Sequence, residues 1–400
     1  MTSDILSVRA NILQSINTFP WSSTRQAETI RAYIDHQVAG RGNGRQALLR
    51  SGMVDLTDRQ LQYQLDRGLY YVQRFNRDLN QNIGKIDCRR IHQLAYDDTL
   101  DERTGNKVFG AAYQYNHSQS SVCWAQTLVD RVLVTDRVMN VSYTTYLPKK
   151  YLIRADRPFS EFRTKNQLMR EIFQKDFNHL RAQGLAPDKI WTSLDSWYAS
   201  RLTTRLFRQS GINFLQGLKK SSHCSLFGRK SRIDEIFNPD AKWQYVTDPQ
   251  NGKRIHYQVK ILNLTCHGRC QVFAIRRGND KRIRYYATNH LKVHMQRLLL
   301  RLKKHWQVEL MHHDLKQYFG LSSCCTGKET LNQVHWSLCY TTYLLFCRYQ
   351  YQTQQKEYRP TIPQLIHAYQ YDYDYERARK CFFSPKARTK LIKRILGGKC

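Results

Sequence analysis

The sequence predicts an α/β fold with a mixed-sheet core, a β-rich insertion, and helical regions at both ends. Three observations support this prediction. Apolar residues recur three and four positions apart before residue 80, helical patterns return after residue 322, and strand-like runs bounded by turn residues fill the middle. Because 41% of the 400 residues are hydrophobic, the chain can bury a substantial core.

Helical spacing marks the first expected region, residues 1–85. Thr24–Gln37 and Asp58–Leu79 both carry apolar residues at helical intervals. The basic, glycine-rich stretch 40–45 between them is typical of a loop. No sharp helix-turn-helix signature is present in the sequence, so a DNA-contacting region and a structural brace both remain open.

Residues 86–211 are expected to form the first part of the core. The expected elements are three strands, one helix and a fourth strand: Arg90–Tyr96, Cys123–Val134, Val138–Leu147, Ser160–Gly184 and Lys189–Leu194. This order is that of a ribonuclease H-like core. In such a core the first and fourth strands are neighbours in the sheet, and each presents a carboxylate at its end.

Residues 212–290 are expected to supply the last core strand, Ile212–Leu218, and then the β-rich insertion. Turn sequences separate the insertion strands, which we place at Lys242–Thr247, Ile255–Leu264, Gln271–Arg276 and Arg282–Thr288.

A long helix follows and completes the core. It is expected from Leu291 to Phe319 and to end at Gly320, which assigns residues 291–321 to it. Residues 322–400 are helical and aromatic and close in the basic run 386–399. We expect this C-terminal region to contribute to dimerisation.

The charge of the chain indicates a polyanionic partner. Lys and Arg number 64 against 32 Asp and Glu, so the net charge is 64 − 32 = +32. Nucleic acid is favoured over lipid headgroups, because the charge is spread among 25 Tyr and 7 Trp. No apolar run is long enough to span a bilayer, and no secretory signal is evident, so we expect a cytoplasmic protein without a membrane role.

Cysteine usage favours reduced thiols. The eleven cysteines form no regular framework. Cys266 and Cys270, with His267 between them, have the spacing of a zinc half-site, but a convincing second pair is missing nearby. A tight turn between two strands is therefore the favoured interpretation.

Three acidic residues that follow apolar or aromatic runs are the candidate catalytic and metal-binding residues: Asp97, Asp195 and Glu309. Phosphoryl transfer by two metal ions needs carboxylates that hold both cations, and Mg²⁺ prefers carboxylate oxygens and water. Asp98 is the alternative to Asp97, since strand alternation turns only one of them to the cleft. The form Asp-x-Thr, which ends in Thr99, favours Asp97.

Basic residues share a helical face with Glu309. His305, His312 and Lys316 lie four positions before it, three after it and seven after it. This pattern suits a metal ligand beside a DNA phosphate, with Lys316 as a point-charge phosphate contact. A solvated face with ordinary ion pairs has the same spacing, and both interpretations stay open on periodicity alone.

The acidic motifs resemble the catalytic signatures of DDE transposases of bacterial insertion sequences, in particular the large family-four group. The residues that carry the resemblance are Asp97-Asp98-Thr99, Asp195-Ser196-Trp197-Tyr198, Trp306-Gln307-Val308-Glu309, Asp314-Leu315-Lys316-Gln317 and Gly320-Leu321. The resemblance covers roughly residues 90–325 and also implies a β-rich insertion between the second and third acids.

The third signature departs from the family at two positions. The family has Tyr and Arg where this chain has Leu302 and His305, whereas Glu309 and Lys316 keep the family separation. In the family, that Tyr and Arg contact DNA phosphates near the cut. Two outcomes are open. Either His305 and neighbours such as Arg301 take over these DNA contacts, or the transposase activity of this chain is weakened.

The resemblance implies an Mg²⁺-dependent enzyme, with Mn²⁺ as a substitute, that cuts the terminal inverted repeats of its element and joins them to target DNA. It also implies a homodimer in a synaptic complex on double-stranded DNA, associated with the bacterial nucleoid. A decayed DNA-binding remnant and a structure-selective nuclease on the same core are the alternatives.

Basic residues of the insertion are expected to track DNA phosphates, and the candidates are Lys219, Lys220, Arg276 and Arg277. In related enzymes an aromatic residue of the insertion stacks on an extruded base, which makes Trp243 a candidate. A core Trp on a strand is the favoured interpretation of Trp243.

Overall fold

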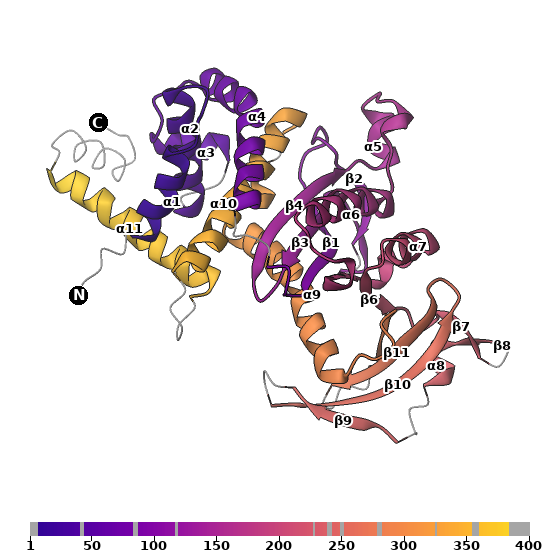
Figure 1. Cartoon of the computed structure of the whole chain (residues 1–400). Coiled ribbons are helices and arrows are strands. Elements are labelled where there is room, and N and C mark those ends of the chain that lie inside the picture. Colours follow the sequence, from indigo (N-terminus) through magenta and orange to yellow (C-terminus); the bar gives the residue numbers. More distant parts are fainter. Residues whose placement is uncertain are drawn as a thin grey trace, which may run out of the picture. The chain divides into compact units, whose positions relative to one another are not determined.

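The computed structural model describes residues 7–40, 44–82, 87–116, 119–226, 229–237, 242–248, 252–277, 282–324, 326–353 and 360–383. Residues 41–43 of the expected glycine-rich loop and the basic run 386–399 lie outside this set. The chain divides into two compact units (Figure 1). The helical unit comprises Met1–Ile83, Thr104–Phe109 and His313–Cys400, and the sheet unit comprises Gly84–Arg103 and Gly110–His312.

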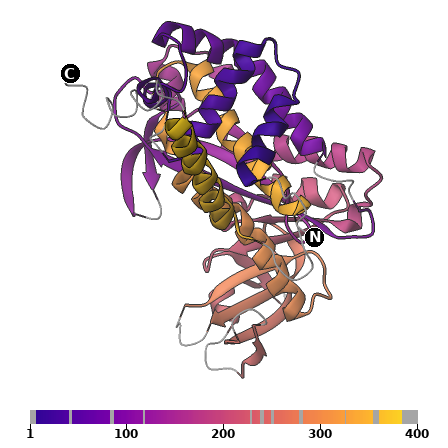
Figure 2. The same cartoon turned by 90° about the vertical axis from the view of Figure 1, so that its left-hand side faces the viewer.

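The helical unit combines helices from both ends of the chain. These are α1 (Val8–Asn17), α2 (Thr24–Val38), α3 (Arg45–Ser51), α4 (Asp58–Asn82), η4 (Leu321–Ser323), α10 (Glu329–Gln352), α11 (Ile362–Phe383) and the end of α9 (Met295–Gln317). Serine hydroxyls cap the first two: Ser7 accepts from the N–H of Ala10, and Ser23 accepts from that of Gln26. The indigo helix α1 and the yellow helix α11 lie side by side in Figures 1 and 2.

Helix α10 forms the core of this unit. Its segment 334–347 is buried throughout, which explains why the most apolar stretch of the chain falls there. It packs along α4, and Asn76 of α4 donates to the Thr341 hydroxyl at 3.2 Å. None of the described helices is long and apolar enough to cross a membrane.

The sheet unit contains the strands β1 (His92–Glu102), β2 (Ala112–Asn116), β3 (Ser121–Val134), β4 (Val138–Tyr146), β5 (Ile190–Leu194), β6 (Asn213–Leu218), β7 (His223–Leu226), β8 (Arg229–Arg232), β9 (Gln244–Thr247), β10 (Arg254–Leu264), β11 (Gly268–Arg277) and β12 (Arg284–Thr288). Its helices are α5 (Lys149–Arg154), η1 (Phe159–Glu161), α6 (Lys165–Ala182), η2 (Pro187–Lys189), η3 (Ser196–Tyr198), α7 (Arg201–Gln209), α8 (Ile233–Ile236) and most of α9.

The strand order confirms the predicted mixed α/β core. Strand β1 pairs antiparallel with β3 and parallel with β5, and β5 pairs parallel with β6. Strand β4 pairs antiparallel with β3 on the other side. In the β1–β5 register, Ala95 lies opposite Ser193 and Tyr96 opposite Leu194. The two strands expected to carry the first and second acids are therefore neighbours.

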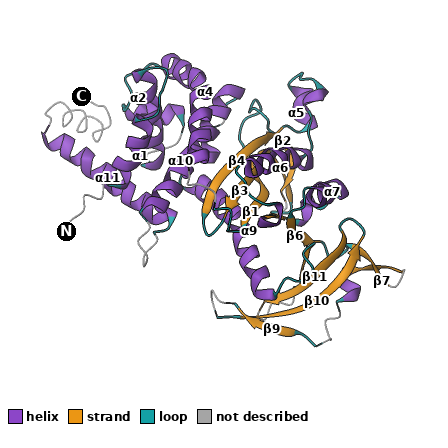
Figure 3. Ribbon diagram, in the orientation of Figure 1, coloured by secondary structure: helices purple, strands orange, loops and turns teal. Residues whose placement is uncertain are grey.

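Helices α6 and α9 cover opposite faces of this core (Figure 3). On the α6 face, Tyr96 and Arg131 both donate hydrogen bonds to Asp176. On the α9 face, the Gln93 amide donates to the backbone carbonyl of Arg301 at 2.9 Å. Because strand side chains alternate, even-numbered residues of β1 face α6 and odd-numbered ones face α9.

The β-rich insertion continues the core sheet. Strand β12 pairs with β6, and β11, β10, β7 and β8 follow outward, while β9 pairs with β10. An apolar cluster joins the insertion to the start of α9 and contains Trp191, Leu215, Ile255, Phe273, Ile275, Val293, Met295, Leu298 and Leu299. The insertion therefore anchors the helix that carries Glu309.

Some boundaries differ from those expected. Strand β1 runs on to Glu102, because the backbone of Asp97 and Asp98 still pairs with β3, so the two acids lie within the strand and not at its end. Helix α6 begins at Lys165 rather than Ser160, since Thr164 and Gln167 form a capping box. Strand β2 pairs along the first half of β3 and was not expected.

Candidate active site

The centre of the candidate site is formed by Asp97 on β1, with Glu309 and His312 on α9. One ligand atom from each of these three side chains lies within 4.8 Å of the others. His312 follows Glu309 by three positions, so both project from one face of the helix. The structure therefore brings together the first and third predicted acids and adds a histidine to which the sequence argument assigned no metal role.

Asp97 is held in an environment that disfavours its charge. The pKa of its carboxyl is raised well above the ordinary value of 3.8, first by burial and then by the negative charges of Glu309 and Asp98. Two carboxylates that approach each other in this way repel unless a proton or a cation lies between them. Their oxygens together with the His312 nitrogen form a donor set that fits a divalent cation.

His312 is itself positioned by a buried carboxylate. Its Nε2 atom lies 2.8 Å from a carboxylate oxygen of Asp130, and the Asp130 side chain is fully buried. Asp130 lies opposite Asp97 in the β1–β3 register, so both project toward α9. The Asp130 carboxylate thus fixes the orientation of the imidazole beside the two acids.

Asp98 is engaged on the other face of the sheet. The Lys165 ammonium on α6 lies 2.6 Å from one of its oxygens, and the Tyr198 hydroxyl donates to the other at 2.9 Å. Burial and the charges of Asp98 and Asp97 raise the pKa of the Tyr198 phenol well above its ordinary value, so it stays a donor. Asp98, the alternative candidate for the metal ligand, is therefore already paired with the Lys165 ammonium.

Asp195 follows β5 and begins the turn η3, where its exposed carboxylate accepts from the N–H of Ser196 at 2.5 Å. It is not a member of the close group found among the described residues. Its charge acts on His305: burial lowers the pKa of that imidazole, and the carboxylates of Asp195 and Glu309 oppose the effect. Gly217 on β6 passes so close that a Cβ there would lie 3.2 Å from the Ser196 nitrogen.

A family model described as a transposase DDE domain matches residues 160–345. The chain carries a transposase DDE domain. The matched segment includes Asp195 and Glu309, whereas Asp97 lies before it on β1. No curated protein shows significant similarity to the sequence.

Both departures from the expected third signature in the DDE domain are half-buried. Leu302 packs against the apolar cluster at the start of α9. His305 lies beside β5, with Nδ1 3.2 Å from the Ser193 hydroxyl. Arg301 lies over the Trp191 ring at 4.7 Å, and burial lowers its pKa to about 10. These side chains support the α9–sheet packing of the domain.

The basic residues predicted to contact DNA lie at the ends of β6 and β11 and on α9. Lys219 and Lys220 are exposed after β6, and the Lys219 ammonium lies 5.1 Å from the centre of the exposed Trp197 ring. Arg276 and Arg277 end β11, and the Arg276 guanidinium lies 5.0 Å from the Trp243 ring centre. Trp243 precedes β9 and is half-buried. On α9, Lys316 is exposed in the last turn.

His267 and Cys270, which belong to the zinc half-site considered from the sequence, are engaged in contacts within the protein. The His267 Nδ1 atom lies 2.6 Å from the Thr204 hydroxyl, and burial lowers the pKa of His267 to about 4. Burial raises the pKa of the Cys270 thiol to about 11. Cys266 and His267 lie in the turn between β10 and β11, and Cys270 lies on β11, so the turn interpretation that the sequence favoured describes the first two residues.

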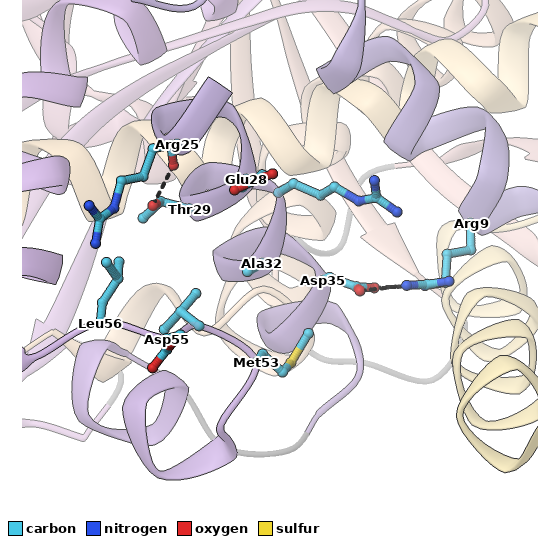
Figure 4. Close-up of a pocket in the computed structure, with 11 residues that line it drawn as sticks. Arg9, Arg25, Glu28, Thr29, Ala32, Asp35, Met53, Asp55 and Leu56 are labelled. Carbon is cyan, nitrogen blue, oxygen red and sulfur yellow. Dashed lines mark hydrogen bonds and ion pairs between the residues drawn. The ribbon is translucent and has the colours of Figure 1, made fainter. Parts of the chain in front are cut away.

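A cavity of about 380 Å³ lies in the helical unit (Figure 4). It is lined by side chains of both signs, and its Arg9 is paired with Asp35 at 2.6 Å. None of Asp97, Asp195 and Glu309 lines it.

Proposed function

We propose that this protein is the transposase of a bacterial insertion sequence, which cleaves DNA at the ends of its element and transfers those ends into target DNA. The approach of Asp97 on β1 to Glu309 on α9 supports this proposal most directly. Asp195 completes the set, since it follows the strand that pairs in parallel with β1.

Asp97, Asp195 and Glu309 would hold divalent cations, Mg²⁺ or Mn²⁺. When bound, these cations activate the attacking oxygen and stabilise the leaving oxygen of an in-line displacement at phosphorus. The residues of the chain fit this role because burial first, and then the like charges of Glu309 and Asp98, raise the pKa of Asp97, and a bound cation would offset both effects. We assign His312 as an additional donor and Asp130 as the residue that orients it.

The proposed partner is double-stranded DNA, at both the terminal inverted repeats and the target. The net charge of +32 supports binding that weakens steeply with salt. Lys219, Lys220, Arg276 and Arg277 would follow phosphates, and Lys316 would contact a phosphate beyond Glu309. We further propose that the protein forms a homodimer in a synaptic complex with DNA. Its proposed location is the bacterial nucleoid.

A second candidate is a DNA-binding remnant that has lost cleavage. It is favoured by Leu302, which is packed in the apolar cluster where the family has a tyrosine that contacts DNA, and by the half-buried His305. A remnant would bind the same DNA without cutting it in Mg²⁺ or Mn²⁺.

The deciding experiment is cleavage of a plasmid that carries the DNA flanking the gene, with Mg²⁺ and then with Mn²⁺. Wild type would be compared with Asp97→Asn, Asp195→Asn and Glu309→Gln, and with Asp188→Asn as a control in an exposed acid of η2.

We expect end-specific cutting in the wild type and the control, and none in the three variants. Binding without cutting in the wild type would establish the remnant. Cutting that ignores the flanking sequence would establish a structure-selective nuclease.

A further inference from the structure

Helix α4 of the helical unit presents an outward face made of arginine and tyrosine. We call this face the α4 stripe, and its members are Arg59, Tyr63, Arg67, Tyr70, Arg74 and Arg77. All six are exposed, and the two tyrosines are 53% and 62% accessible. At 100° per residue they fall within a sector of about 80°, so they form one continuous row along the helix.

Packing of the helical unit does not account for this row. The other side of α4 buries its apolar residues, which are Leu61, Leu65, Val72, Phe75 and Leu79. That side packs against α10 and α2. The stripe is therefore the face of α4 left over when its core contacts are made.

The stripe also retains its positive charge. Among the described residues, none of its four arginines forms an ion pair with a carboxylate, whereas Arg9 and Arg45 of the same unit pair with Asp35 and Asp58. Asp66, at one edge of the stripe, accepts a hydrogen bond from the Thr330 hydroxyl at 2.7 Å. Four unneutralised arginines on one exposed face favour an anionic partner.

Aromatic side chains hold two of the stripe arginines, Arg67 and Arg74. The Arg67 guanidinium donates to the Tyr63 hydroxyl at 2.6 Å and lies 5.3 Å from the centre of that ring. Arg74 lies 5.8 Å from the centre of the Phe19 ring. These contacts restrict the rotamers of two long side chains before any partner binds, which lowers the entropic cost of binding.

We propose that the α4 stripe binds the phosphate backbone of duplex DNA. From Arg59 to Arg77 the helix extends about 27 Å, the length of roughly eight base-pair steps. A membrane surface is disfavoured as the partner, because an interfacial helix turns a strongly apolar face to lipid and the stripe contains no aliphatic residue. The inference rests on the proposed function in that DNA is the substrate.

The test is fluorescence anisotropy of the full chain on a labelled duplex from the DNA flanking the gene, at several salt concentrations. The variant is Arg59→Ala with Arg77→Ala, the two stripe arginines whose side chains bond to no other residue in the described part of the chain. The matched control removes two exposed charges on other helices of the same unit, with Arg25→Ala on α2 and Arg379→Ala on α11. Arg59→Lys with Arg77→Lys keeps the charge on the stripe.

We expect the stripe variant to bind at least about 10-fold more weakly, with a log–log salt slope shallower by about 1.8, or about 0.9 for each phosphate that an arginine no longer neutralises. The control should stay within about threefold of wild type, because neither of its charges lies on the α4 stripe, and the lysine variant should recover most of the slope. Unchanged thermal unfolding midpoints would show that the variants are folded.

Equal weakening by the stripe variant and the control would overturn the proposal, and so would a stripe variant that binds like wild type. A wild-type chain that binds the duplex through the stripe but never cleaves DNA would refute the proposed function and leave the stripe assignment intact.

Discussion

Asp97 and Asp98, adjacent on strand β1, are held by oppositely charged surroundings: Asp97 approaches Glu309, whereas Asp98 lies 2.6 Å from the Lys165 ammonium. The alternation of the strand sends one carboxylate to α9 and the other to α6. A carboxylate already paired with lysine has less need of a metal ion than one beside another carboxylate. This relationship favours Asp97 as the ligand.

Asp97→Asn should raise the stability of the metal-free protein. The variant removes a charge that burial and Glu309 disfavour, so we expect its unfolding midpoint in EDTA to rise by about 2–4 °C, the effect of 1 kcal/mol in a domain of this size. Because the pKa of Asp97 is raised, the folded wild type holds a proton that the unfolded chain releases, and wild-type stability falls as pH rises above 3.8. The increase in the unfolding midpoint caused by Asp97→Asn should therefore be larger at pH 8 than at pH 4. A variant less stable than wild type in EDTA would contradict this account.

His312→Ala should weaken metal binding by at least about 10-fold, because loss of a residue that only orients a ligand already costs roughly 10–100-fold. Calorimetric titration with Mn²⁺ measures the affinity directly, without DNA or turnover. His313→Ala is the matched control, since this neighbouring histidine is exposed. Equal affinities in wild type and His312→Ala would remove His312 from the site.

Lys165→Met should destabilise the protein by about 1–3 kcal/mol, because it leaves the Asp98 carboxylate, 17% exposed, without its cation. Adding Asp98→Asn should restore most of that loss, which urea denaturation can measure. Asp98→Asn alone should keep Mn²⁺ binding, whereas Asp97→Asn should lose it. The reverse pattern would make Asp98 the ligand.

Gly217→Ala should reduce DNA cleavage without unfolding the domain. Its new Cβ would lie 3.2 Å from the Ser196 nitrogen and 3.5 Å from an Asp195 carboxylate oxygen, so the turn that carries Asp195 must shift by a few tenths of an ångström. Misplacement of a catalytic group by about 1 Å can cost 100-fold in rate, and we expect a loss of about 10-fold. Circular dichroism and cleavage kinetics together test this, and full activity would show that the turn tolerates the shift.

Local patterns in the sequence were sufficient to predict much of the core. Strand and helix order follow from periodicity and turn residues, which act over a few positions, and the predicted pairing of the first and fourth strands is confirmed by β1 and β5. The insertion between the second and third acids was predicted for the same reason. Periodicity cannot reveal how long a strand continues beside a partner, so the extension of β1 past Asp97 and Asp98 was missed.

Side-chain contacts between the helices and the sheet were beyond the reach of the sequence. The choice between Asp97 and Asp98 depends on which helix covers which face of the sheet, and the proposed metal-donor role of His312 depends on its contact with Asp130 of β3. The α4 stripe became visible only when burial separated the outward arginines from the face that packs on α10. Residue types and spacings therefore predicted the family and the candidate acids, whereas only long-range packing brings the side chains of Asp97, Glu309 and His312 within 4.8 Å of one another.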